Sequence, residues 1–494
     1  MTLNGEPVDG TLAMQVTYQR MGGYLTRFFL LAGGAAALLA AAGFFGAAAA
    51  AQSLSADILV VGAGGAGMAA AIEAREASGG TAKVVILEKL PFVGGTTLLA
   101  STAYNAGGSK LQPDYSAEDY AKKLLKGVPK ADEHDKANIK QLAELSGPTA
   151  DWLIDMGADM SRIINGSQMT PADGSAYGAM IVPVLKKRID ALGIEVVTNA
   201  DVEELITDAS GRVTGVRAHL KTAQKNAHLN DIAAQAVILA TGGFASNPKL
   251  VERFTPQWAG YPSTASVGAT GDGILMAEKL GAKLDNMVLA GPKTVAYDTG
   301  HGAVSLTNVR YNGAILVGKT GKRFTNELGS TATIGADIKA QPDGVAFLVF
   351  DRTSVENAAL MKKYEELGYF VKADTLDALA GKLGVDQANL KATVARWQGF
   401  FDKKKDDDFG RTQSMFSRID RAPYYGQKIS PASQTTYGAV ERNADGAALK
   451  PDGTVIPGLF VAGETADQYG QGVSLGIITG RIAARGALKA IEAK

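Results

Sequence analysis

The stretch DILVVGAGGAG, residues 57–67, decides the fold of this chain. Its first part, Asp57–Val61, is a short apolar run that ends at a glycine, which is the pattern of a buried parallel strand. An alanine-rich helix is predicted next, over Met68–Ala77, and then a second strand over Lys83–Leu87. A strand, a helix and a strand in this order form a βαβ unit, so we expect an α/β fold with a parallel sheet.

The glycines of this stretch satisfy the pattern G-x-G-x-x-G of a dinucleotide-binding turn. The first, Gly62, makes the tight turn; the second, Gly64, lets the backbone approach a pyrophosphate; the third, Gly67, lets the helix pack closely on the strand. Glu88 follows the second predicted strand, where an acidic residue accepts hydrogen bonds from a ribose hydroxyl. The combination predicts a dinucleotide site; the alternative is that these glycines serve only a tight turn.

The α/β pattern continues along the chain. A helix is predicted over Ala176–Leu192, and the strands that follow it are Glu195–Val197, Val202–Thr207, Val213–His219 and Ala236–Ala240. Residues 246–372 have more aromatic residues and alternating segments such as Gly313–Val317 and Val345–Phe350, which indicate an inserted second domain. We therefore expect a first part of the dinucleotide-binding domain over 55–245, a capping domain over 246–372, and a C-terminal part over 373–494.

The C-terminal part opens with a predicted helix over Thr375–Phe401 and ends with a strand, a glycine-rich turn and a helix over Gly458–Glu492. Between them lies the charge run 403–408, Lys-Lys-Lys-Asp-Asp-Asp. Such a run is typical of a solvated helix end, and we do not expect it to be a binding tail.

The first fifty-one residues differ from the rest. Arg20 and Arg27 precede an uncharged run, residues 28–51, that is rich in alanine and ends in an Ala-x-Ala sequence. A basic segment, an apolar stretch and such an ending indicate a secretory signal peptide, cleaved near Ala51. The alternative is an uncleaved membrane anchor, since about 20 apolar residues can span a bilayer. We expect an exported, periplasmic protein whose membrane contact, if any, is made by residues 1–51.

Composition excludes several classes of protein. Lys+Arg and Asp+Glu both number 50, so there is no basic excess to bind nucleic acid. The chain has no cysteine, which removes disulfides, iron–sulfur clusters and attached c-type haem. Its four histidines are dispersed without metal-ligand spacing, so no metal site is predicted.

The glycine turn alone does not decide between NAD and FAD, but later motifs do. The sequence resembles the flavoprotein family of fumarate reductases, succinate dehydrogenases and 3-ketosteroid dehydrogenases over roughly residues 55–494. The motifs that carry the resemblance follow in the family's order: Gly94-Gly95-Thr96-Thr97, Tyr104-Asn105-Ala106-Gly107-Gly108, Ala240-Thr241-Gly242-Gly243-Phe244, Thr270-Gly271-Asp272-Gly273, Gly313–Val317, Gly321–Glu327 and Pro457–Glu464. The resemblance implies a Rossmann-type FAD-binding domain with an inserted α+β capping domain.

The resemblance also implies how FAD is held. Gly62–Gly67 would bind the pyrophosphate, Glu88 the adenosine ribose, and the backbone of Val202 the adenine. The N-terminus of the last helix, at Gly472–Gly476, would face flavin O2. The residues that we expect to bind FAD are Gly62, Gly64, Gly65, Ala66, Gly67, Glu88, Lys89, Gly95, Thr96, Thr97, Asn105, Val202, Thr241, Gly242, Asp272, Glu464, Ser474 and Leu475. No histidine occurs near Thr96–Asn105, so the attachment should be non-covalent.

The catalytic pattern of the fumarate reductases is largely missing. Most of the positions at which that family carries its catalytic and substrate-binding histidines and arginines hold other residues here: Gly291, Thr331, Gln434–Ala439, and Gln468 or Tyr469. Arg310 matches an arginine of the family's proton relay, whereas the relay's acidic partner has become Thr307. A dicarboxylate site without its arginine clamp would be poorly compensated, so fumarate itself is doubtful as the substrate.

The remaining candidates for catalysis are Arg310, Tyr437 and Tyr469. The steroid-dehydrogenase relatives use tyrosines to polarise a ketone and move a proton, and Tyr104, Tyr311 and Lys293 are further polar groups of this kind. Each tyrosine is alternatively a packing residue.

We expect an exported FAD oxidoreductase that reduces or forms a C=C bond conjugated to a carboxyl or carbonyl group, by hydride exchange with flavin N5. Its substrate would be a small enoate or enone. Because the chain has no ligands for haem or a cluster, electrons would pass to or from a separate cytochrome or quinone-linked protein. Two alternatives stay open: an enzyme of the 3-ketosteroid-dehydrogenase type that uses tyrosines, and a non-catalytic flavin electron-transfer protein.

Overall fold

The computed structural model describes residues 54–493 apart from 102, 129, 165, 166, 222–226, 301, 468 and 471. The predicted signal peptide or anchor, 1–51, lies outside this range. Among the described residues, no helix is both long enough and apolar enough to cross a membrane.

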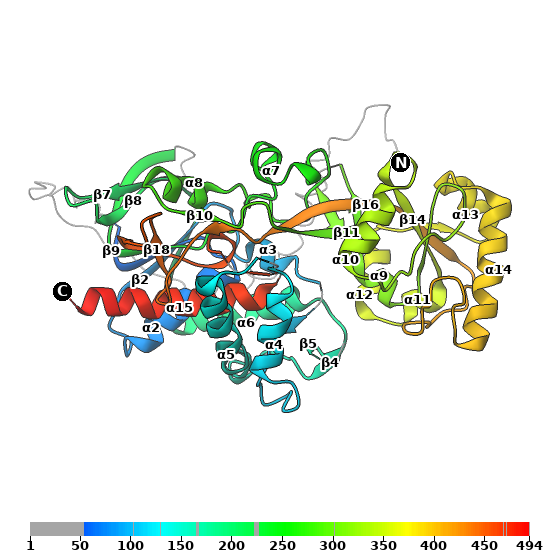
Figure 1. Ribbon diagram of the computed structural model, residues 1–494, viewed down its shortest axis with the longest axis horizontal. Helices are drawn as coiled ribbons and strands as arrows, with labels where there is room; N and C mark the ends of the chain where they lie inside the picture. The colour runs from blue at the N-terminus through cyan, green and yellow to red at the C-terminus, as the bar shows by residue number, and fades with distance from the viewer. Residues whose placement is uncertain are drawn as a thin grey trace, which may run out of the picture. The chain divides into compact units, whose positions relative to one another are not determined.

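The predicted βαβ unit forms the centre of an eight-stranded sheet (Figure 1). Its strands run in the order β18-β19-β9-β1-β2-β6, and β8 and β7 continue from β9. The parallel strands are β1 (Ser55–Val61), β2 (Val84–Glu88), β6 (Glu195–Thr198), β9 (Ala227–Leu239) and β19 (Val455–Val461). The antiparallel ones are β7 (Ala200–Thr207), β8 (Val213–Lys221) and β18 (Ala447–Leu449). Each strand predicted in this region is present, within a few residues at most ends.

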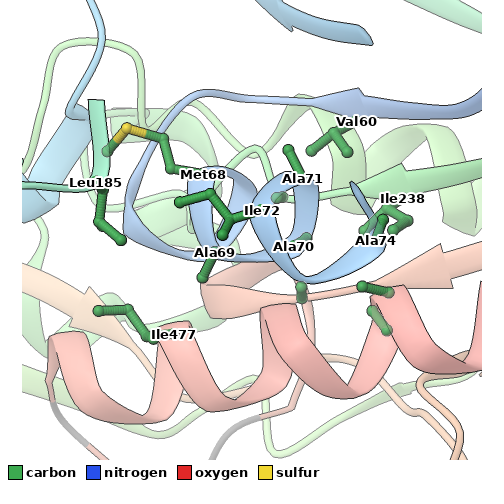
Figure 2. Packing of buried hydrophobic residues seen from close by; sticks show 14 of the residues in the cluster. Val60, Met68, Ala69, Ala70, Ala71, Ile72, Ala74, Leu185, Ile238 and Ile477 are labelled. Carbon is green, nitrogen blue, oxygen red and sulfur yellow. The ribbon is translucent and has the colours of Figure 1, made fainter. Parts of the chain in front are cut away.

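Two small-residue helices cover one face of this sheet. In helix α2 (Gly65–Ala77) the residues that face the core are mostly alanines, and Ile72 and Met68 fill the gaps between them (Figure 2). Helix α15 (Val473–Glu492) crosses α2 closely, and a Cβ on Gly480 would lie 2.2 Å from the carbonyl oxygen of Ala66. Side chains without bulk therefore let the C-terminal helix reach the glycine turn. Helices α4 (Ala117–Leu125), α5 (Glu133–Asp155) and α6 (Tyr177–Ala191) complete this region.

A second, six-stranded sheet belongs to the predicted capping domain. Its strands run in the order β12-β11-β16-β14-β13, with β15 also paired to β16. They are β11 (Ala290–Asp298), β12 (Ala303–Ser305), β13 (Ile315–Val317), β14 (Ala346–Asp351), β15 (Val371–Ala373) and β16 (Tyr424–Thr436). This sheet extends beyond residue 372, where the sequence analysis ended the cap, because β16 returns from the C-terminal part to pair with β14 and β11.

The helical segment after residue 372 also differs from its prediction. It forms two helices, α13 (Leu376–Leu383) and α14 (Gln387–Lys403), because Gly384 adopts a left-handed conformation, φ 70°, that ends the first. Trp397 and Leu379 of these helices are fully buried against β13 and β14. The segment thus shares its core with the cap.

We expected the charge run 403–408 to be a solvated helix end, but the structure buries one of its residues. Asp406 is 1% exposed and lies 2.8 Å from Arg323, which also pairs with Glu327. Arg411 pairs with the same glutamate at 3.1 Å. An isolated buried carboxylate would be costly, so Asp406 is stable there only because an arginine far along the chain lies beside it.

Shorter elements connect and flank the two sheets. They are α3 (Gly95–Leu98), β3 (Tyr104–Asn105), β4 (Arg162–Ile164), β5 (Gln168–Thr170), α7 (Pro248–Phe254), α8 (Asp272–Lys279), β10 (Leu284–Asp285), α9 (Thr307–Tyr311), α10 (Thr331–Lys339), α11 (Arg352–Glu356), α12 (Ala359–Glu366) and β17 (Ala439–Val440), with 3₁₀ turns at Pro256–Trp258, Pro342–Gly344 and Gly463–Thr465.

Candidate active site and cofactor cavity

A cavity of about 900 Å³ opens where β1, β2 and β9 end and α2 begins; we call it the cofactor cavity. Its position at the carboxyl ends of parallel strands is where nucleotides bind in such sheets. The predicted residues that line it are Gly62, Gly64, Gly65, Ala66, Glu88, Lys89, Gly95, Thr96, Thr97, Val202, Thr241, Gly242, Asp272 and Glu464. Gly67, Asn105, Ser474 and Leu475 are not among the lining residues.

Glycine occupies the three positions of the turn for different physical reasons. Gly62 has φ 105°, and a Cβ there would lie 2.4 Å from the carbonyl oxygen of Ala240. A Cβ on Gly67 would lie 1.9 Å from the carbonyl oxygen of Gly62. Gly64 is different, because its φ of −74° suits any residue and a Cβ would meet nothing within 4 Å. The protein itself requires the first and third glycines, whereas only an occupant of the cavity requires the second.

Glu88 and Lys89 fix the walls near the predicted ribose site. The buried carboxylate of Glu88 accepts hydrogen bonds from the backbone N–H of Ala63, 2.7 Å, and of Leu90, 2.8 Å. Burial nevertheless raises the pKa of Glu88, because desolvation outweighs these hydrogen bonds. Lys89 Nζ lies 2.6 Å from Asp272, and so joins the end of β2 to the start of α8.

Another part of the wall is formed by Gly463, Glu464, Gly472, Val473 and Gly476. Glu464 Oε2 accepts a hydrogen bond from the N–H of Thr436, 3.2 Å, at the end of β16. Burial raises the pKa of Glu464 to about 7. This hydrogen bond joins the long strand of the second sheet to the cofactor cavity.

The residues of α15 and its N-cap that line the cavity are not the predicted Ser474 and Leu475. Gly472, Val473 and Gly476 line it. Ser474 and Leu475 are fully buried on the other side, in contact with Tyr120 and its neighbours. The sequence analysis predicted where this helix begins, but it could not tell which residues of the first turn line the cavity. Asn105 lies next to Gly472, and its Oδ1 accepts a hydrogen bond from Lys123, 3.3 Å.

These features fit FAD. Two helix N-termini, of α2 and α15, meet at the cavity without an acidic residue in either first turn, and such termini bind negative groups. The open space above Gly64 accommodates a group that approaches the backbone. Segment 266–269, which the sequence analysis did not predict, closes the cavity from the other side.

A second cavity, of about 1610 Å³, lies between the inserted segment and residues 162–175; we call it the cationic cavity. Loop 95–101 joins the two sites, since it lines the cofactor cavity at Thr96 and the cationic cavity at Ser101. The side chains that matter are three cations and a set of neutral polar groups. They are Arg162, Lys293 and Arg310, together with Ser101, Gln168, Thr170, Ser175, Thr294, Thr307, Asn308, Tyr311, Asn312, Thr331 and Asn357. No carboxylate is among the described residues that line it.

Arg310 is held rigidly in the wall of this cavity. It is 2% exposed, its Nη1 donates to the carbonyl of Glu327 at 2.8 Å, and its guanidinium stacks on Tyr311. Burial lowers its pKa. Three buried polar atoms around the cavity have no partner among the described residues: Arg310 Nε, Ser101 Oγ and Thr294 Oγ1. A ligand or ordered water is the usual partner of such groups.

Lys293 lies on β11 and faces Arg310 in this cavity. No described residue pairs with its ammonium group. Burial, and secondarily the charge of Arg310, lower the pKa of Lys293 to about 8. Sequence reasoning mentioned Lys293 only in passing and missed Arg162 on β4 entirely, because neither belongs to a motif.

The two predicted catalytic tyrosines lie elsewhere. Tyr469 is 1% exposed, accepts a hydrogen bond from Asn138 at 2.9 Å and packs on α5. Tyr437 is half-buried near Glu464, and burial raises its pKa. Neither lines either cavity. Of the three candidates only Arg310 lies in a place where substrate could reach it.

A group of acidic residues lies outside both cavities. One carboxylate oxygen from each of Asp135, Asp285 and Asp467 lies within 4.8 Å of the others. Asp467 is 1% exposed, and burial together with its acidic neighbours raises its pKa to about 8, although Asn286 donates to it at 2.6 Å. Burial likewise raises the pKa of Asp135. Asp467 is therefore expected to retain its proton near neutral pH.

The raised pKa of Asp467 predicts that the stability of the protein depends on pH. The folded protein holds the Asp467 proton up to about pH 8, whereas the unfolded chain releases it near pH 4, so the free energy of unfolding falls as the pH rises between them. Asp467→Asn should remove a slope on the order of 1.4 kcal/mol per pH unit at most. Chemical unfolding at pH 5 and 8 would measure it, with exposed Asp114→Asn as control. An equal loss at both pH values, or stabilisation of the wild type by added Mg²⁺ or Ca²⁺, would contradict this assignment.

The chain has clear relatives. A family model described as "FAD binding domain" matches residues 57–476. A "Fumarate reductase (cytochrome)" of Shewanella frigidimarina is 34% identical over 453 residues, which cover 88% of this chain and 77% of that protein. A "Urocanate reductase" of Eggerthella lenta is 34% identical over 430 residues, which cover 83% of this chain and 70% of that protein. An "NADH:fumarate oxidoreductase" of Klebsiella pneumoniae is 33% identical, but this chain spans only 44% of its length.

A solved structure agrees with these relatives. The open conformation of a flavocytochrome c3 fumarate reductase superposes with a TM-score of 0.75 at 29% identity, and covers 90% of this chain and 79% of that one. The mixed α/β sheet with its added cap is therefore a known arrangement.

Proposed function

Because this chain belongs to the FAD-binding flavoprotein family that contains fumarate reductases and 3-ketosteroid dehydrogenases, we propose that it reduces or forms a C=C bond conjugated to a carboxylate. It is an FAD-dependent oxidoreductase that acts on CH–CH groups. When bound, FAD supplies or accepts the hydride. The observation that carries the proposal is the cationic cavity, which adjoins the cofactor cavity and offers three cations with no carboxylate.

The cavity favours an anionic substrate over a neutral ketone. Arg162, Lys293 and Arg310 face a space without counter-ions, so a substrate carboxylate would supply the missing negative charge. Two cations that the sequence analysis did not propose as catalytic, Arg162 and Lys293, thus join Arg310 in compensating for the expected loss of a carboxylate clamp. Arg310 is rigid and buried, and would stabilise the charge that develops on the carboxylate in the transition state.

The two alternatives have less support. A reaction of the steroid-dehydrogenase type would need tyrosines near the substrate, but Tyr437 and Tyr469 lie outside the cationic cavity. A protein that only transfers electrons would need no cavity lined by unpartnered polar atoms such as Thr294 Oγ1. We keep the enone among the test compounds because Tyr311 does line the cavity.

Electrons would come from, or go to, a separate cytochrome or quinone-linked protein, since this chain carries no cysteine. We further propose non-covalent FAD and export to the periplasm, based on the absence of histidine near Thr96–Asn105 and on the N-terminal segment 28–51.

The direct test is anaerobic. The flavin of the purified protein would be reduced with dithionite, and its reoxidation followed by absorbance after addition of enoates (fumarate, acrylates, urocanate) or enones. Reoxidation by an enoate, faster than by any enone, is expected. Reoxidation by enones alone would favour the steroid-dehydrogenase type, and none by either class, with FAD bound, would favour the non-catalytic protein.

A further inference from the structure

Reduction of a C=C bond needs a proton as well as a hydride, and the proton donor must lie in the substrate cavity. The titratable side chains among the described residues of the cationic cavity are Arg162, Lys293, Arg310 and Tyr311. Arg310, which matches an arginine of the family's proton relay, is held by the carbonyl of Glu327, and Arg162 is exposed to solvent, so we assign both guanidinium groups to binding the substrate carboxylate. The hydroxyl of Tyr311 lies 3.5 Å from Arg310 Nη2. The choice is therefore between Lys293 and Tyr311.

We propose that Lys293 is the catalytic proton donor, which delivers its proton to the substrate carbon next to the carboxylate; this rests on the proposed function. Its side chain lines the cavity, its ammonium group has no hydrogen bond or ion pair with a described residue, and it lies beside Arg310 in a wall without carboxylates. Unlike a lysine in an ion pair, it is free to approach the substrate. The position is half-buried, so water can restore the proton after each turnover.

The electrostatics of the site make this lysine a better acid than an ordinary one. Desolvation and the charge of Arg310 lower its pKa to about 8. A donor with a pKa near the working pH is the most effective. Of the cavity's other titratable groups, Arg162 and Tyr311 share its walls.

The elements packed on β11 bring no counter-ion to Lys293. On α10, Asp337 is engaged with Thr325 at 2.6 Å, and Lys339 with the carbonyl of Gln257 at 2.7 Å. The adjoining part of β16, residues 430–436, and strand β12 have no charged residue. The lowered pKa therefore follows from cations and burial without a compensating carboxylate.

The step balances simply. The double bond gains two electrons with the hydride, which arrives at one carbon from the reduced cofactor. The other carbon takes the proton as the Nζ–H bond of Lys293 breaks, which leaves a neutral amine. Solvent then returns a proton to the amine, and the product is the saturated carboxylate.

The test compares Lys293→Met with Lys293→Arg, Tyr311→Phe and, as a matched surface control, Lys362→Met. The single-turnover rate of flavin reoxidation by the best enoate would be measured from pH 6 to 10. In the wild type the rate should fall as the pH rises through about 8, since the donor loses its proton. Lys293→Met should slow the rate roughly hundredfold at pH 7 and abolish that fall. Lys293→Arg should bind a saturated carboxylate normally yet remain slow. Tyr311→Phe should retain the fall in rate near pH 8 that Lys293→Met loses, and Lys362→Met should resemble the wild type.

A second readout does not depend on activity. Competitive acetylation, followed by mass spectrometry of the peptide that contains Lys293, would give the pKa of this lysine directly. A value near 8 is expected, and a value near that of a free lysine, about 10.4, would overturn the proposal. If the wild type is active and Lys293→Met is fully active as well, the proposal for Lys293 is overturned and the proposed function is not. A wild type that no enoate reoxidises would overturn both this proposal and the proposed function.

Discussion

Gly64→Val should lower the affinity for FAD roughly hundredfold while the protein remains folded. The backbone of Gly64 is extended and a Cβ there would meet no protein atom within 4 Å, so we expect the substitution to leave the apoprotein folded. The same side chain would stand in the cofactor cavity, where the pyrophosphate must approach the first turn of α2. The flavin content of the purified protein, and titration of the apoprotein with FAD, would measure the loss.

Two other glycines make this test specific. Gly399→Val is the matched control. A Cβ on Gly399 would also meet nothing within 4 Å, but this residue lies on the exposed face of α14. It should bind FAD as the wild type does. Gly67→Ala should instead destabilise the fold, since its Cβ would clash with Gly62. If Gly64→Val kept its FAD, the pyrophosphate would not lie at this turn.

Arg310→Met should reduce kcat/KM for the best enoate by roughly 100- to 1,000-fold. The guanidinium is a buried, preorganised charge that the carbonyl of Glu327 holds in place. FAD content should not change, because Arg310 does not line the cofactor cavity. Loss of this neighbouring cation should also raise the pKa of Lys293, so the alkaline fall in rate should move to higher pH.

Tyr437→Phe is the informative companion of this variant. Tyr437 lies outside the cationic cavity, so its kcat/KM should stay within about threefold of the wild type, the small effect usual for a substitution away from the chemistry. Equal and large losses in the two variants would instead favour a tyrosine-based reaction. An Arg310→Met enzyme of full activity would show that the substrate binds elsewhere.

Local sequence predicted the cofactor half of the molecule well. The apolar run that becomes β1, the alanine-rich α2 and the acid Glu88 each have a pattern that depends on near neighbours only. The glycine turn adds a steric demand between near neighbours, because a Cβ on Gly67 would lie 1.9 Å from the carbonyl oxygen of Gly62. For that reason most residues expected to bind FAD do line the cofactor cavity.

The substrate half could not be predicted in the same way. Arg162 on β4, Lys293 on β11 and Arg310 on α9 come from three distant segments and meet only in the folded chain. The sequence pattern around Asp406 predicted a solvated residue, because Arg323, its partner in the fold, lies far away in the sequence. The aromatic Tyr469 has the chemistry of a catalytic residue but packs in a core.

The sequence by itself determined the parallel α/β sheet, the glycine turn and the FAD family, because periodicity and steric demand act between residues close in the chain. Only the tertiary structure decided which residues of α15 line the cofactor cavity, that β16 and α14 share the sheet and the core of the cap, and which cations line the cationic cavity. Those outcomes depend on burial and on charges brought together across long stretches of chain. Burial and electrostatic interaction act through space, and no local pattern records them.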